Sequence, residues 1–238
     1  MASIINAFRN IISDSSWFLK TVLMAVPVFM VLNYSIGQGT GFDEKTMALF
    51  GAVLCIYIGC GTYMMNRNIN NNSPILPNLL GLPELLFHSF FSMLIVIPGI
   101  LACAFTLKMF STYLSFDFNT MLIMYVLIII FFSPFIFIPL VLYAVNGKIQ
   151  EVFNFKSLFD GAGNFIVAIF TLVIQYVFTF AIVWFLAYKV FSEMMEDYLL
   201  INVINSFFIV LTFWVLFSYV SDQYGESIPD PRKLDERF

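Results

Sequence analysis

The stretch that organises this chain is residues 146–170, which read NGKIQEVFNFKSLFDGAGNFIVAIF. It opens as a polar loop, continues as a short two-sided helix, is expected to break at Gly161 and Gly163, and then enters a long apolar run. In helical projection, apolar side chains share one wide arc and polar side chains lie opposite. This pattern is typical of a helix in the membrane interface that leads into a membrane-spanning segment. The apolar arc comprises Ile149, Val152, Phe153, Phe155, Leu158 and Phe159.

The composition of the whole chain requires a lipid environment. Of its 238 residues, 61% are hydrophobic and 11% are charged, whereas a soluble domain carries about 25% charged residues. So few polar groups would not cover a surface in water, so the bilayer is the solvent for most of the chain. The net charge of −4 argues against nucleic acid as a partner. Cys55, Cys60 and Cys103 all lie in apolar runs, which predicts free thiols rather than a disulfide framework.

Spans are predicted from the gaps between charged residues. A hydrocarbon core of about 30 Å needs about 20 helical residues, and six windows free of Asp, Glu, Lys and Arg reach that length. They are residues 21–42, 46–66, 85–107, 118–147, 161–188 and 198–221. The sequence therefore predicts an all-α membrane bundle of six transmembrane helices over residues 1–222, followed by a tail over residues 223–238 without a core of its own.

The distribution of basic residues predicts the orientation. With six spans, one side of the membrane holds eight Lys and Arg residues and the other holds three. The positive-inside rule then places both termini in the cytoplasm, for a multi-pass protein of a bacterial plasma (inner) membrane. The basic side carries Arg9, Lys20, Arg67, Lys148, Lys156, Arg232, Lys233 and Arg237, and the other side carries Lys45, Lys108 and Lys189.

Three amphipathic segments, near residues 3–13, 74–81 and 148–160, are predicted to be short in-plane helices on the cytoplasmic face. Residues 9–12, 77–80 and 156–159 can be aligned without gaps, and each segment precedes a span. This indicates a threefold pseudo-repeat of an in-plane helix plus a transmembrane hairpin. The predicted contact residues for lipid or a partner are Phe8, Ile11, Ile12, Leu79, Leu80, Phe153, Phe155, Lys156, Leu158 and Phe159.

Helix packing and a cavity are two further expectations. Gly51, Cys55 and Gly59 place a small residue at every fourth position of the second span, which allows close approach of a neighbour and predicts a central position in the bundle. Broken helices line substrate sites in transporters, so prolines and polar residues within the spans mark a candidate cavity. Its residues are Pro134, Pro139, Gln175, Asn202, Asn205 and His88.

Catalytic patterns are scarce. His88 is the one histidine of the chain and lies four residues after Glu84, so the two could form an acid–base pair on one helical face. There is no zinc-protease motif, nucleophile triad or phosphate-binding loop. The sequence predicts a protein that is not an enzyme and that binds no cofactor or metal.

The loop after the fourth span and the region before the third resemble a known family. Phe153-Asn154-Phe155, Leu158 and Asn164-Phe165 match its aromatic–acidic–aromatic signature, with Asn154 where the family carries Asp. Residues 76–87 correspond to its Leu-Pro segment, without the usual tryptophans. The chain thus resembles bacterial and archaeal multi-spanning membrane proteins grouped as a domain of unknown function. The resemblance implies a six-helix membrane protein and brings no activity, substrate or catalytic residue.

Three functional hypotheses follow. The first is a scaffold or subunit of a membrane complex that contacts membrane lipids or other membrane subunits through its in-plane helices. The second is a permease-type exporter subunit that works with an ATPase, with residues 75–80 as a coupling helix. The third, less favoured, is a lipid enzyme that uses Glu84 and His88.

Overall fold

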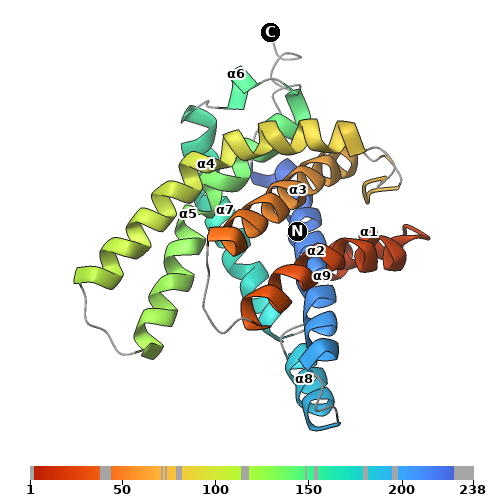
Figure 1. Ribbon diagram of the computed structural model, residues 1–238. Helices are drawn as coiled ribbons and strands as arrows, with labels where there is room; N and C mark the ends of the chain where they lie inside the picture. The colour runs from red at the N-terminus through yellow and green to blue at the C-terminus, as the bar shows by residue number, and fades with distance from the viewer. Residues whose placement is uncertain are drawn as a thin grey trace.

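The computed structural model describes residues 3–37, 44–70, 72, 74–78, 82–113, 118–147, 149–152, 155–178, 182–194 and 198–227. At some helical positions, residues 34–37, 44–47 and 155–158 among them, it describes the backbone alone. All regular secondary structure in these ranges is helical (Figure 1). The helices are α1 (Ile4–Ile12), α2 (Trp17–Gly37), α3 (Glu44–Ile69), α4 (Leu82–Tyr113), α5 (Phe118–Asn146), α6 (Ile149–Val152), α7 (Phe155–Tyr176), α8 (Ile182–Met194) and α9 (Tyr198–Ser227).

Four of the described helices are long and apolar enough to cross a membrane, as the helices of a membrane protein are. The helices α1 and α2 meet at an angle of 100° and together count as a fifth candidate span. The structure therefore supports four spans, or five if the bent pair is one span, and does not confirm the six expected. The four spans are Ala48–Ile69, Leu85–Thr112, Ile123–Asn146 and Leu199–Gln223.

The structure describes the predicted fifth window, residues 161–188, as two helices, and residues 179–181 between them lie outside the described residues. The helix α7 ends at Tyr176, and α8 begins at Ile182. The apolar part of α7, Gly161–Tyr176, is by itself too short to be counted as a span. Within α7 the chain stays helical through Gly161 and Gly163, so the expected break there is wrong. In a membrane, unbroken helix satisfies every backbone N–H, which outweighs the low helix propensity of glycine.

The helix α3 packs against α2, α4, α5 and α9, while α9 contacts still more of the described helices, so the predicted central position of α3 is not distinctive. Large buried side chains surround it. Tyr57 stacks on Trp214, with ring centroids 6.2 Å apart and planes at 21°. The ring of Phe217 lies against Gly61 so closely that a Cβ atom at that position would overlap it. Glycine is required there because two helices touch.

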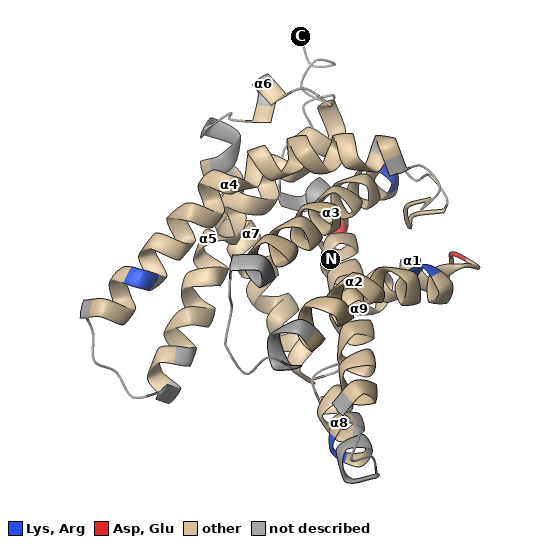
Figure 2. Ribbon diagram, in the orientation of Figure 1, with Lys and Arg blue, Asp and Glu red and all other residues tan. Residues whose placement is uncertain are grey.

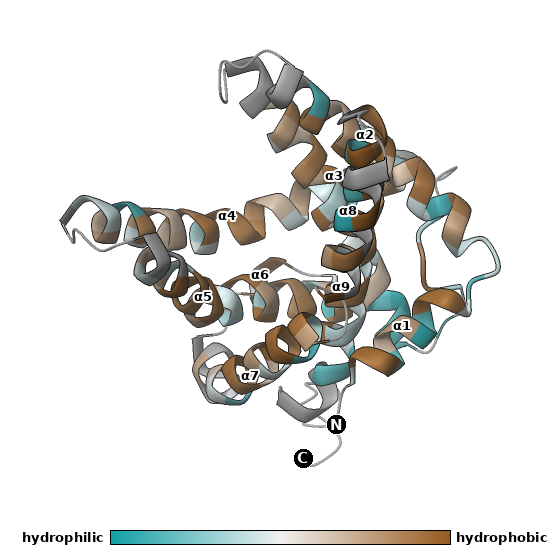
Figure 3. Ribbon diagram, turned by 90° about the horizontal axis from the view of Figure 1, so that it is seen from below, coloured by the Kyte–Doolittle hydropathy of each residue, from teal (hydrophilic) through white to brown (hydrophobic). Residues whose placement is uncertain are grey.

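The outer surface of the described bundle is apolar. Large side chains such as Phe18, Leu101, Phe105, Ile123 and Phe178 are well exposed. Figure 2 shows charged residues near helix ends, with the middles of α4, α5, α7 and α9 uncharged, and Figure 3 shows the same helices strongly hydrophobic. A surface of this kind suits hydrocarbon rather than water.

The predicted in-plane helix at residues 74–81 is not seen in its described part. Residues 74–78 are not helical, and Leu76 and Pro77 are buried. Pro77 explains the difference, because the residue before a proline, here Leu76, is disfavoured in the α conformation. The region expected to be helical near residues 3–13 does contain α1.

Two further boundaries differ from those expected. The amphipathic segment at residues 148–160 is divided into α6, which has four residues, and the beginning of α7. The last helix continues to Ser227, into the predicted tail, while its candidate span ends at Gln223; the predicted end of the membrane domain at residue 222 stays a prediction. Residues 228–238, most of the predicted tail, lie outside the described residues.

Candidate functional site

Polar side chains from distant parts of the chain meet where α3 and α9 end. Asn68 Nδ2 donates hydrogen bonds to Ser221 Oγ and, at 2.8 Å, to Asp222 Oδ1. Asn10 Nδ2 of α1 donates to Ser218 Oγ at 3.4 Å and to Asn68 Oδ1 at 3.5 Å. We call these five residues the end cluster. It ties the first helix of the chain to the last one.

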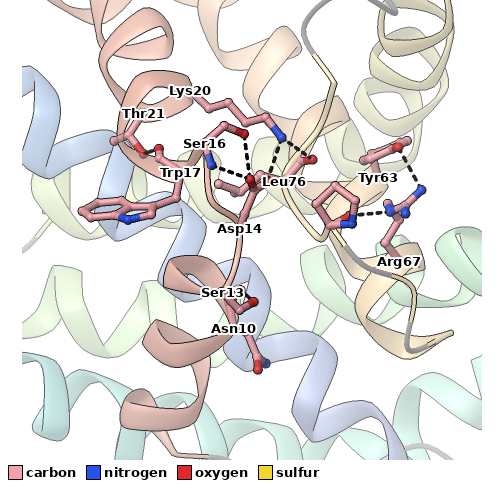
Figure 4. A network of polar contacts seen from close by, with 11 residues as sticks. Asn10, Ser13, Asp14, Ser16, Trp17, Lys20, Thr21, Tyr63, Arg67 and Leu76 are labelled. Carbon is pink, nitrogen blue, oxygen red and sulfur yellow. Dashed lines mark hydrogen bonds and ion pairs between the residues drawn. The ribbon is translucent and has the colours of Figure 1, made fainter.

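A second set of contacts holds the sharp turn between α1 and α2 (Figure 4). Asp14 Oδ1 accepts hydrogen bonds from the Ser16 backbone N–H at 2.9 Å and from Ser16 Oγ at 2.7 Å. Lys20 Nζ lies 2.7 Å from Asp14 Oδ2, and it also donates to the Leu76 carbonyl at 3.3 Å. The turn is followed by α2, which starts at Trp17, and one lysine links the turn to residues 74–78.

Electrostatics at this turn favour the charged carboxylate. Burial of Asp14 raises its pKa, but the hydrogen bonds from Lys20 and Ser16 outweigh burial and hold the pKa below its usual range. The Asp14 side chain is 3% exposed and that of Lys20 is 15% exposed, so solvent screens the pair only weakly. An ion pair that is buried and fully hydrogen-bonded fixes geometry more than it offers a reactive group.

A second cation binds the same non-helical segment. Arg67 Nε donates a hydrogen bond to the Pro74 carbonyl at 2.6 Å. Arg67 Nη1 also lies 3.3 Å from the hydroxyl of Tyr63, and its guanidinium carbon is 5.7 Å from the centre of the Tyr63 ring. Lys20 and Arg67 therefore both use backbone carbonyls of residues 74–78. Those carbonyls would be occupied if the segment were a helix, so these bonds agree with its extended form.

The helix α1 buries one side and exposes the other. Ile11 is fully buried among core residues, and Phe8 packs against them, so the prediction of Ile11 as an outward contact is wrong. Ile12 is 42% exposed, and Ile5, which the prediction missed, is 66% exposed. Arg9 lies on the exposed side. The periodicity of α1 identified an apolar arc but could not tell which edge of it faces protein, because both protein and lipid are apolar.

The remaining predicted contact residues are only partly described. Phe159 is well exposed on α7, with its ring centroid 6.3 Å from that of Phe135. The backbones of Phe155, Lys156 and Leu158 belong to the first turn of α7, but their side chains lie outside the described residues. The positions predicted as contacts that fall outside the description altogether are Leu79, Leu80 and Phe153.

The polar residues proposed for a cavity are bound to different neighbours. Asn202 Nδ2 donates to Asn33 Oδ1 at 2.8 Å, which links α9 to α2. Asn205 Oδ1 accepts a hydrogen bond from Trp184 Nε1 at 3.1 Å, beside an apolar groove of about 570 Å³ between α8 and α9. Each amide thus joins a pair of helices, which is the usual task of Asn in a membrane bundle.

Gln175, another residue of the predicted cavity, accepts a hydrogen bond from the N-terminus of α1. Its Oε1 accepts from the backbone N–H of Ile4 at 3.3 Å, while Ser3 Oγ accepts from the N–H of Ile5 at 3.2 Å. These bonds cap the N-terminus of α1, whose first N–H groups have no partner within the helix. Gln175 therefore anchors α1 to α7.

The prolines and the histidine of the predicted cavity lie along α4 and α5. Pro134 and Pro139 are buried inside α5, which remains one helix through both. Pro134 has no N–H to donate to the Ile130 carbonyl four residues earlier. The hydroxyl of Ser133 donates a hydrogen bond to that carbonyl instead, at 2.6 Å. The His88 ring on α4 faces Tyr143 of α5 edge-on, with centroids 6.3 Å apart. The structure thus places these three residues at the α4–α5 side and the amides elsewhere.

The helices α3 and α4 approach each other closely at Gly59. A Cβ atom added to Gly59 would overlap the side chain of Ser89 and lie 2.5 Å from the Ser89 Cα. Cys55 Sγ lies 3.6 Å from the Ser89 carbonyl, and Ser92 Oγ donates to Thr62 Oγ1 at 2.9 Å. This α3–α4 seam was anticipated by the spacing of small residues, except that Gly51 has open space around it.

The chemistry open to the described residues is limited. Among them, no group of three or more His, Cys, Asp or Glu side chains lies close enough to hold a metal ion. The three cysteines are free thiols, as predicted. The Glu84 side chain lies outside the described residues, so its pairing with His88 stays a prediction. Comparison with family models, with curated proteins and with solved structures finds no match to this chain.

Proposed function

We propose that this chain is a non-enzymatic multi-pass protein of a bacterial plasma membrane, acting as a scaffold or subunit of a membrane complex. The observation that carries the proposal is the exposed side of α1. The helix is fixed to the bundle through Ile4, Ala7 and Ile11, and it presents Ile5, Arg9 and Ile12 outward. An apolar strip with one cation suits a partner protein or the headgroup region of lipid.

The internal polar groups support a role without catalysis. Asp14 and Lys20 bind each other, Asn202 binds Asn33, and Gln175 caps α1. Groups used in this way hold helices in place, whereas a catalytic or transport site needs polar groups that a substrate can reach.

Six crossings, with both termini cytoplasmic, are part of the proposal. The end cluster joins the ends of α3 and α9 to α1, and Asn66 at the end of α3 donates to the Ala144 carbonyl at the end of α5. The chain therefore leaves this end of the bundle with α7 and returns to it with α9. In our proposal, α7 and α8 together make the outward crossing, and α2 makes the first one.

The other hypotheses have less support. The exporter hypothesis needed a coupling helix at residues 75–80, and residues 75–78 are not helical. The lipid-enzyme hypothesis rests on Glu84 and His88 alone. The relation to the domain-of-unknown-function family stays a proposal, based on the motifs at residues 153–165 and 76–87.

The test is affinity purification of the tagged full chain in mild detergent, with partners identified by mass spectrometry. We expect a reproducible partner that is lost when Ile5→Ser, Arg9→Glu and Ile12→Ser are combined. The matched control is Ile123→Ser on α5, whose side chain is 61% exposed and which should keep the partner. A monomeric chain without partners, or equal loss in the control, would contradict the proposal.

A further inference from the structure

An apolar groove of about 570 Å³ at α8 was described above, and a larger one of about 660 Å³ runs along α5. Its floor is α5 between Leu127 and Phe132, and its walls come from α4 and α7. Both α4 and α7 pack against α5, yet within the described residues they do not pack against each other. Figure 3 shows α5 between them. We call this space the α5 groove.

The lining of the α5 groove selects an apolar occupant. Its one side-chain oxygen is that of Thr106, which already donates to the Ala102 carbonyl at 2.8 Å. The other lining side chains are aliphatic or aromatic. A polar ligand or a chain of waters would find no partner there, and apolar cavities remain dry.

The surroundings of the α5 groove determine which apolar molecule reaches it. Its floor and one wall belong to membrane spans, and the other wall is the apolar part of α7. The rim residues Val167, Phe131 and Phe170 are well exposed and continue the apolar outer surface. The medium at the mouth of the groove is therefore the hydrocarbon of the bilayer, and lipid chains are the molecules present there at high concentration.

The size of the lining residues argues against a helix from a partner or a second copy. Helices in membranes approach each other through Gly, Ala and Ser, as α3 and α4 do at Gly59. The α5 groove instead presents bulky rings, those of Phe110, Phe132 and Phe170 among them. A flexible chain can follow such a surface, whereas a rigid helix would leave voids beside it.

From these observations we propose that the α5 groove holds one acyl chain of a membrane phospholipid, which exchanges more slowly than the surrounding lipid. This inference depends on the membrane location of α4, α5 and α7 and not on the scaffold role. A partner could therefore be absent while the bound lipid is present, and the two tests fail independently.

The experiment uses the full chain purified in mild detergent after growth or reconstitution with phosphatidylethanolamine and phosphatidylglycerol. Native mass spectrometry after stepwise delipidation should show one retained phospholipid per chain. Val167→Trp fills the groove and should lower that retention about tenfold, which corresponds to about 1.4 kcal/mol of lost affinity. The matched control Val203→Trp, at an exposed position of α9 outside the groove, should keep the lipid.

A second measurement covers the case in which Val167→Trp does not fold. A phospholipid with a photoreactive diazirine in its acyl chain should label wild-type residues of the α5 groove above other exposed apolar positions such as Val203. Labelling spread evenly over the exposed surface, no retained lipid in the wild type, or equal loss in both Trp variants would overturn the proposal. A protein or a second copy crosslinked in the groove would do the same.

Discussion

The close contact between Gly59 on α3 and Ser89 on α4 allows a sharp test of the packing. We consider Gly59→Ala, which adds one methyl group. That carbon would overlap the Ser89 side chain and lie 2.5 Å from the Ser89 Cα. A rotamer change of Ser89 moves its Oγ away but moves neither its Cβ, at 2.7 Å, nor its Cα, so the two helices must move apart.

The expected change in the free energy of unfolding has two opposing parts: a loss from overfilled packing and a gain from higher helix propensity. Overfilling a packed interior costs typically about 1–3 kcal/mol, and separating α3 from α4 would also lengthen the Ser92–Thr62 hydrogen bond. Replacing Gly by Ala in a helix returns up to about 1 kcal/mol. The control Gly51→Ala gains the same propensity on the same helix and meets nothing within 4 Å. We therefore expect Gly59→Ala to be less stable than Gly51→Ala by about 2 kcal/mol.

The assay is reversible unfolding in mixed detergent micelles, followed by circular dichroism, for both variants and the wild type. Combining Gly59→Ala with Ser89→Gly removes the side-chain part of the overlap and should restore part of the lost stability. Equal unfolding free energies for Gly59→Ala and Gly51→Ala would refute the close approach of α3 and α4. The close approach would also be refuted if adding Ser89→Gly to Gly59→Ala restored none of the lost stability.

Three other outcomes are expected. Because the pKa of Asp14 is lowered in the folded chain, its stabilising effect is present above the unfolded-state value of about 3.9 and is lost as pH falls through the folded-state pKa. The difference in thermal midpoint between wild type and Asp14→Asn should therefore shrink between about pH 6 and about pH 3, and a constant difference would contradict the ion pair with Lys20. Asn202→Leu leaves Asn33 without its hydrogen-bond partner and should cost about 1 kcal/mol, with a double-mutant cycle showing coupling; additive effects would refute the contact. Gly61→Ala adds a methyl group that overlaps an aromatic ring of α9, so its thermal midpoint should fall below that of Gly51→Ala; an unchanged midpoint would show that α3 and α9 are further apart.

The charge gaps of the sequence predicted the central parts of four spans well. The windows at residues 46–66, 85–107, 118–147 and 198–221 lie within or close to α3, α4, α5 and α9. This works because a charge in hydrocarbon is costly, so its position marks a boundary. The helices extend beyond the windows where a charge reaches solvent or a partner, as Asp222 reaches Asn68.

The sequence was less informative wherever apolar residues face other protein rather than lipid. The α-helical part of α7 ends at Tyr176 and a π-helical turn follows at residues 177–178, and no charge or proline of the window marks this change. The non-helical residues 74–78 accept hydrogen bonds from Lys20 and Arg67, which lie on α2 and α3. The hydrogen-bond partners of the amides in the predicted cavity could not be predicted either. An Asn within a span indicates that a hydrogen-bond partner exists, but not which residue it is.

The docking of α1 has a consequence for how the protein is made. Asn10 finds one partner 208 residues later in the chain, and Ile4 finds one 171 residues later. A ribosome makes α1 long before α9, so much of the protein surface that covers the apolar side of α1 is missing until α9 has been made. During that interval the lipid interface is the natural place for it. Docking of α1 against α9 must therefore follow the synthesis of α9, and such long-range contacts form slowly; removal of α9 would leave α1 without this surface.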